Sequence, residues 1–163
     1  MLIRFKKGKN QHKHKPDTLT CIRDDGSVTW THIHHGFVQH DFAHYVVETT
    51  LGFQNAFFGL VAKGYDIPDF SLPTSERPFK IPKEAMVAEP IVALLQAELW
   101  ESFPDPLLQP DSQELPANAT PTQIEIMRKH LRNLLQQWEN LAPGESMDLQ
   151  FDTLGVKYNG PLT

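Results

Sequence analysis

The residues of this chain best suited to chemistry are histidines, with eight in 163 residues and five of them between positions 32 and 44. Two of them form the pattern His40-Asp41-x-x-His44. On a helix, side chains four positions apart lie on the same face, so His40 and His44 can reach one metal ion, as in H-E-x-x-H zinc sites. Those sites carry a glutamate as general base where this chain has Asp41, whose carboxylate is one methylene shorter. The pattern predicts His40 and His44 as metal ligands and Asp41 as a catalytic or supporting carboxylate.

Glu48 continues the same pattern, four residues after His44. Eight positions separate it from His40, which is about 12 Å along a straight helix, so one small ion cannot bind His40, His44 and Glu48 together. Two roles remain open for this carboxylate. Glu48 orients His44 through the second ring nitrogen, a common arrangement around metal sites, or it binds the ion with His44 while His40 lies outside. We therefore count Glu48 with Asp41 among the candidate catalytic residues.

A complete metal site needs at least one more ligand. His34 and His35 precede the predicted helix, and a turn at Gly36 would bring them back to its first turn. We include both histidines in the predicted ligand set. Other candidates lie on later predicted helices: Glu89, Glu98 and His130.

Two other interpretations compete with the metal site. In the first, His40 and His44 are structural and form hydrogen bonds without a metal, as most buried polar side chains do. In the second, they catalyse a reaction or bind a ligand without metal. Against a purely structural role, Val47 and Leu51 lie on the same helical face, and burying imidazoles there costs free energy unless something compensates. The His-Asp doublet also resembles that of metal-dependent HD-type phosphohydrolases, but those domains are all-helical and this chain opens with strands.

Composition excludes several classes of protein. Cys21 is the only cysteine, which excludes an intrachain disulfide and a four-cysteine zinc site. The chain has no P-loop, no G-x-G-x-x-G and no G-x-S-x-G motif, so no nucleotide or organic cofactor is indicated. No run of 18 apolar residues suggests a membrane span. The N-terminus lacks the apolar stretch of a signal peptide, and we expect a cytoplasmic protein.

Charge is distributed unevenly along the chain. Six lysines and arginines and no acids lie within residues 1–15, whereas the whole chain has a formal charge of −5 and an isoelectric point of about 5.9. We interpret residues 6–17 as a mobile basic segment. Nucleic-acid binders usually have isoelectric points above about 9, which argues against that class of partner. The expected partner is a small-molecule or peptide substrate.

The pattern of elements predicts an α+β fold in a single domain spanning 1–163. The Asp25-Gly26 pair separates two β-branched runs, which predicts a hairpin over 18–33. One long helix is predicted over 37–62, a second over 83–103 around Pro90, and a third after Thr120. A proline-rich loop over 103–121 connects the last two, and residues 146–151 return as a strand. We expect a small antiparallel sheet packed on three main helices, with the central helix buried.

The segments LTCIRDDGSVTW and HDFAHYVVETTLGFQNAFFGLVAKGYDIPDF carry a resemblance over about residues 18–70. This stretch resembles a family of small uncharacterised bacterial proteins that combine a DDGS-type hairpin with an H-D-x-x-H-[FY]-x-V-E helix. We know of no assigned activity in that family, so the resemblance implies no functional residue.

These observations favour a metal-binding protein, and zinc is the favoured ion. The leading hypothesis is a zinc-dependent hydrolase, because bound zinc lowers the pKa of water for attack at neutral pH. The alternative is a non-enzymatic interaction or regulatory domain with structural histidines. A hydrolase needs a cleft that reaches His40 and His44, whereas an interaction domain would bury both with their hydrogen bonds satisfied.

Overall fold

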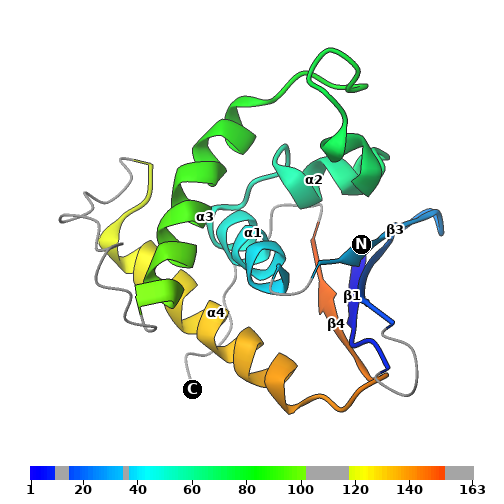
Figure 1. Ribbon diagram of the computed structural model, residues 1–163. Helices are drawn as coiled ribbons and strands as arrows, with labels where there is room; N and C mark the ends of the chain where they lie inside the picture. The colour runs from blue at the N-terminus through cyan, green and yellow to red at the C-terminus, as the bar shows by residue number, and fades with distance from the viewer. Residues whose placement is uncertain (10–14, 35–36, 102–117, 153–163) are drawn as a thin grey trace.

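The computed structural model describes residues 1–9, 15–34, 37–101 and 118–152. In this part of the chain, the elements follow one another in the order β1 (Leu2–Lys6), β2 (Asp17–Ile22), β3 (Val28–Ile33), α1 (Val38–Leu51), α2 (Phe57–Ala62), the 3-10 helix η1 (Ile67–Ser71), α3 (Lys83–Glu101), α4 (Pro121–Asn140) and β4 (Ser146–Gln150). Four antiparallel strands and the helices form the α+β fold that the sequence predicts (Figure 1).

The sheet has the order β3-β2-β1-β4. The predicted hairpin is confirmed as β2 and β3, with Gly26 at a positive φ of 84° in the turn. β4 returns from the far end of the chain to pair with β1, as the sequence also predicts. Alternate side chains point to one buried face, which carries Ile3, Phe5, Leu19, Cys21 and Met147.

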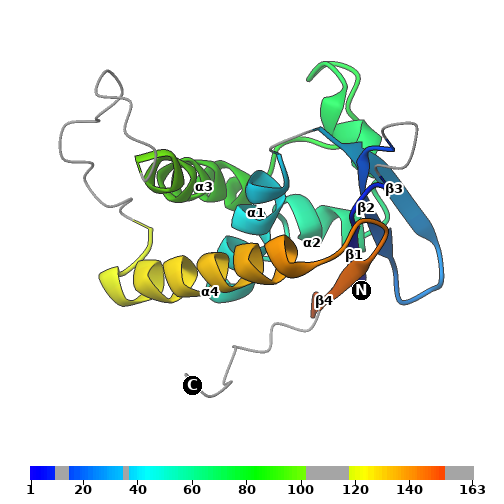
Figure 2. The ribbon, with the colours of Figure 1, turned by 60° about the horizontal axis from the view of Figure 1, so that its bottom comes forward.

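The helices α1, α3 and α4 lie on one side of the sheet, with α1 between the other two (Figures 1 and 2). The ring of Phe42 on α1 lies 4.6 Å from Phe5 of the sheet and 6.2 Å from Trp138 of α4, measured between centroids. α1 is therefore central and buried, as predicted. Its histidines contact α3 and α2, since His40 lies beside Gln96 and His44 beside Glu89 and Phe57.

The prediction of one helix over 37–62 is wrong in one respect, because the chain breaks into α1 and α2. Gly52 ends α1 in the left-handed region with φ 70°, a conformation that glycine adopts without strain. The loop that follows is held by α3, since the carboxylate of Glu84 accepts the backbone N–H groups of Gln54 and Asn55 at 2.7 and 2.5 Å. Tertiary contacts therefore stabilise a break that the apolar pattern conceals.

The other predicted helices are confirmed. α4 begins with the predicted capping box, in which Thr120 and Gln123 each accept a backbone N–H from the other residue. α3 runs unbroken through Pro90. Of the helices in the described ranges, none combines the length and apolarity needed to span a bilayer.

Two predicted segments lie partly outside the described residues. Residues 10–14 belong to the basic segment predicted over 6–17, and residues 102–117 make up most of the loop predicted over 103–121. Both interpretations stay predictions. Lys7, at the described edge of the basic segment, donates to the carbonyl oxygens of Glu139 and Leu141 and satisfies the end of α4.

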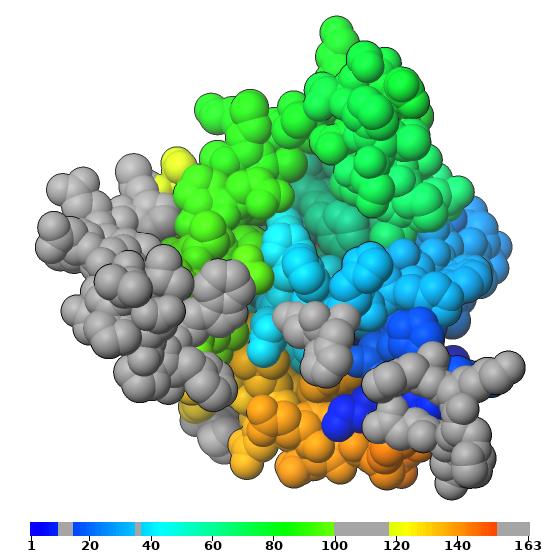
Figure 3. Space-filling view, viewed as in Figure 1, coloured from blue at the N-terminus to red at the C-terminus, as the bar shows by residue number. Residues whose placement is uncertain are grey.

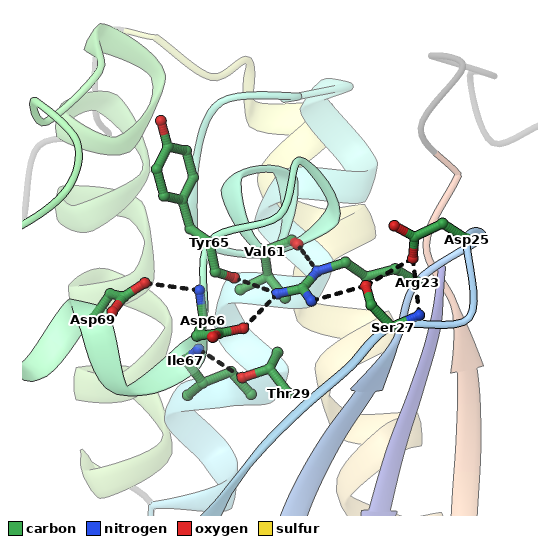
Figure 4. Close-up of polar contacts among 9 residues, drawn as sticks. All are labelled: Arg23, Asp25, Ser27, Thr29, Val61, Tyr65, Asp66, Ile67 and Asp69. Carbon is green, nitrogen blue, oxygen red and sulfur yellow. Dashed lines mark hydrogen bonds and ion pairs between the residues drawn. The ribbon is translucent and has the colours of Figure 1, made fainter.

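Arg23 joins the hairpin to the segment that follows α2 (Figure 4). Its guanidinium is buried and donates to the carbonyl oxygens of Val61 and Tyr65 at 2.6 and 2.7 Å. It also donates to Asp66 at 2.9 Å and to the hydroxyl of Ser27 at 3.1 Å. These bonds hold the start of η1 against the hairpin, where Thr29 of β3 also accepts the N–H of Ile67 at 3.0 Å, and they position one wall of the pocket described next.

Candidate functional site

A pocket of about 520 Å³ opens where α1, α2, η1 and α3 meet. Figure 3 shows the surface hollowed at this point, with α2 on the floor between α3 and the segment that follows η1. Cavities of this size are typical of small-molecule sites. One end is polar and carries His40, Asp41, His44 and Glu89, and the rest is mainly apolar and aromatic.

The two predicted histidines line the polar end together. Their ring centroids are 4.6 Å apart, as expected for residues one turn apart on α1. Nδ1 of His40 lies 3.1 Å from Oε1 of Gln96 on α3. If Nδ1 carries the proton and donates to this oxygen, Nε2 is the ring nitrogen left to accept a proton or bind a ligand.

His44 is buried and its ring is poorly satisfied. Nδ1 is the one buried side-chain polar atom in the described residues that has no hydrogen-bond partner. It lies 3.8 Å from Oε1 of Glu48, which is beyond hydrogen-bond distance. Nε2 lies 3.7 Å from Oε1 of Glu89 on α3. Leaving such a nitrogen buried and unpaired costs about 1–3 kcal/mol, so this ring is not explained as a satisfied core residue.

Burial sets the protonation of this cluster. It lowers the pKa of His44 to about 3, with a smaller contribution from His40, and the imidazole is neutral at pH 7. Asp41 is partly exposed, yet the surrounding protein raises its pKa to about 7, against an opposing effect of His40. Perturbed pKa values of this kind are common in functional sites. A neutral imidazole is also the form that binds a metal.

Glu48 has a structural partner that the sequence did not indicate. Its fully buried carboxylate accepts the backbone N–H groups of Phe58 and Gly59 at 3.1 Å each, and so caps the first turn of α2. Burial raises its pKa to about 8 although these donors pull it down. Glu48 does not line the pocket. Its Oε1 lies 3.8 Å from Nδ1 of His44 without forming a hydrogen bond, so the orienting role that the sequence left open stays a prediction.

Gly59 allows this arrangement. A Cβ at this position would lie 2.4 Å from the carbonyl carbon of Gln54, so the loop between α1 and α2 packs directly on the glycine backbone. The close approach keeps the first turn of α2 under Glu48. It also keeps Phe57 beside His44, with ring centroids 5.6 Å apart.

The other predicted residues that the structure describes are not brought to the pocket. His34 is exposed, contacts the ring of Phe37 and is not among the pocket-lining residues. His35 lies outside the described residues. Glu98 pairs with Arg128 of α4, and neither Glu98 nor His130 lines the pocket. Of the later candidates, only Glu89 joins His40 and His44.

Sequence reasoning missed Gln96 and Arg77, which contact or line the site. Gln96 and Glu89 lie seven positions apart on α3, a spacing that puts both on one helical face. That spacing is visible in the sequence, but the face that meets α1 is not. Across the described ranges, no three His, Cys, Asp or Glu side chains already stand in the geometry of a bound metal ion.

Comparison of the chain with protein-family models, with curated proteins and with solved structures finds no match in any of the three. The functional argument therefore depends on the residues of the pocket.

Proposed function

We propose that this chain binds one divalent metal ion, with zinc favoured, at the polar end of the pocket. The ligands are Nε2 of His40, Nε2 of His44 and the carboxylate of Glu89. The observation that carries the proposal is His44, a buried neutral imidazole whose Nε2 faces a carboxylate from another helix at 3.7 Å.

The distance between His44 and Glu89 suits a shared ion after a small adjustment. Ligand atoms that bind one tetrahedral zinc at bonds of about 2.1 Å lie about 3.4 Å apart. Nε2 of His44 and Oε1 of Glu89 need to close by a few tenths of an ångström to reach that separation, and the Glu89 side chain is 63% exposed and free to turn. A contact of 3.7 Å is too long for a hydrogen bond.

Residues behind the histidines support the same role. Histidines that bind metals usually direct the other ring nitrogen at an acceptor, which fixes the ring. Gln96 Oε1 lies behind His40 at 3.1 Å, within hydrogen-bond distance, whereas Glu48 Oε1 lies 3.8 Å behind His44 and would have to move closer to accept its N–H. The alternative of an interaction domain expects both histidines to be satisfied, and His44 is not.

The chemistry that follows is metal-assisted hydrolysis. Three protein ligands leave one position open, which is typical of catalytic zinc sites, and zinc would activate a water there. Asp41 lines the same end of the pocket, where its carboxylate would accept a proton from that water.

The test is metal content and zinc uptake of the full chain, purified without a histidine tag or chelator. We expect the wild type to hold about one equivalent of metal, as a three-ligand site does. Glu89→Gln and His44→Ala should lose it. Glu89 is exposed, so its replacement tests the site without disturbing the core.

The matched control is His32→Ala, which removes an exposed histidine of β3 outside the pocket. It should retain the metal. No uptake by a folded wild type would overturn the proposal, and so would equal loss in His32→Ala and His44→Ala.

A further inference from the structure

The half of the pocket away from the metal ligands is aromatic and carries one cation. We infer that it binds a flat, ring-bearing molecule with an anionic group, such as an aromatic carboxylate, and that Arg77 pairs with that anion. The inference rests on the proposed function in taking this pocket as the active site, and it adds the class of molecule that enters it.

Aromatic side chains form a continuous wall that begins at His44. Phe57 lies 5.6 Å from His44, Phe70 lies 4.7 Å from Phe57, and Phe79 lies 4.8 Å from Phe70, all between ring centroids. All four residues line the pocket. Such a wall favours a planar apolar body, because aromatic rings bury large areas and stack with offset or edge-on geometry.

Arg77 lines the same pocket, two residues before Phe79. Its Nε donates to the carbonyl oxygen of Leu72 at 2.9 Å, which fixes the guanidinium to the loop after η1. Within the described residues, no acidic side chain forms an ion pair with it. The other guanidinium N–H groups are suited to a bidentate contact with a carboxylate.

The charged side chains of the pocket predict the orientation of a bound anion. Asp41 and Glu89 are at the end of the histidines, where an anion would meet like charge in the absence of a metal. Arg77 is on the wall formed by the loop after η1 and offers the opposite sign. An aromatic carboxylate therefore places its ring along the phenylalanines and its charge at Arg77, with the reacting group toward His40 and His44.

The test uses isothermal titration with three carboxylates of increasing ring size, namely benzoate, indole-3-acetate and 2-naphthoate. Each is paired with its neutral amide. Titrations use the chelator-treated full chain, so the result is independent of whether the metal site exists, and they are repeated with Zn²⁺. The variants are Arg77→Gln, Phe70→Ala and the surface control Arg132→Gln, which is outside the pocket.

We expect at least one carboxylate to bind the wild type better than its amide. Arg77→Gln should weaken the carboxylate by about tenfold, the loss of one charge-assisted contact, and leave the amide unchanged. Phe70→Ala should weaken both, and Arg132→Gln neither.

Three results with the metal-free protein would overturn the inference. These are no binding of any probe at millimolar concentration, equal affinity for acid and amide, and an unchanged carboxylate affinity in Arg77→Gln. Binding that requires Zn²⁺ and ignores Arg77 would also overturn it. That last result would place the carboxylate at the metal and leave the proposed function standing.

Discussion

Arg23 and His44 are both buried polar residues, and the protein treats them in opposite ways. The Arg23 guanidinium forms hydrogen bonds with Val61, Tyr65, Asp66 and Ser27. The His44 ring has one nitrogen with no partner and another that faces Glu89 at 3.7 Å. The first residue is part of the scaffold, since all its contacts are within the fold. The second is incomplete within the described structure.

The difference indicates which buried polar residues are candidates for function. A buried polar group with all its hydrogen bonds formed stabilises a single conformation. A buried polar group without a hydrogen-bond partner lowers stability, and such a group is expected where function requires it. Substitutions at the two places should therefore change stability with opposite signs.

The largest effect is expected at Arg23. Arg23→Met should lower the free energy of unfolding by about 3–5 kcal/mol, because it leaves buried carbonyl oxygens without donors. Urea denaturation measures this change. Arg4→Met is the matched control, since Arg4 pairs with Asp148 in solvent, and its effect should be much smaller. Equal losses in the two variants would remove the distinction between a buried network and a surface pair.

Glu48 contacts both kinds of buried group. Its carboxylate accepts hydrogen bonds from the first turn of α2, and it also faces the unpaired ring nitrogen of His44. At about pH 9, above the raised pKa of Glu48, Glu48→Gln should lower the free energy of unfolding by about 1–3 kcal/mol, because an amide nitrogen would face one of the two backbone N–H groups that the carboxylate accepts. Glu139→Gln, at an exposed position of α4, should change nothing measurable in the same urea titration. An unchanged free energy of unfolding in Glu48→Gln would show that the cap does not stabilise α2.

His44 should respond with the opposite sign. His44→Leu replaces an unsatisfied ring by an apolar side chain, and we expect the metal-free protein to gain about 1 kcal/mol of stability. His32→Leu at an exposed position is the control and should be neutral. A loss of several kcal/mol in His44→Leu would mean that His44 is a structural residue.

The smallest effect concerns Cys21, two positions before Arg23. Burial raises the pKa of its thiol to about 12, so on the order of one native molecule in 10⁴ carries the thiolate at pH 8. Labelling with a thiol reagent should be slow and should follow opening of the sheet. Arg23→Met should accelerate it and His44→Leu should not. Rapid stoichiometric labelling of the native wild type would contradict this burial.

The sequence predicts the fold where local signals decide it. Asp25-Gly26 predicts the hairpin, and Thr120 with Gln123 predicts the start of α4; both signals act over a few residues. The break after Leu51 is not predicted, because the apolar pattern continues past Gly52 and conceals the end of α1. The loop between α1 and α2 depends on Glu84, thirty residues further along.

Only the residues of the candidate site that lie on α1 could be predicted from the sequence. The spacing of His40 and His44 brings them to one face of any helix. Glu89, Gln96 and Arg77 reach the pocket through the packing of α3 and the loop after η1 against α1, which no local pattern specifies. Glu48 could be associated with His44 from its spacing, but its bonds to Phe58 and Gly59 require the break in the helix.

The most direct test of the account is zinc-dependent stability in wild type and His44→Leu. Urea unfolding is measured with chelator and with Zn²⁺ at about 100 times the dissociation constant, which should stabilise a one-site protein by about 2.7 kcal/mol. The account predicts this rise in the wild type and none in His44→Leu, even though the variant is the more stable protein without metal. No rise in the wild type, or an equal rise in both proteins, would contradict it.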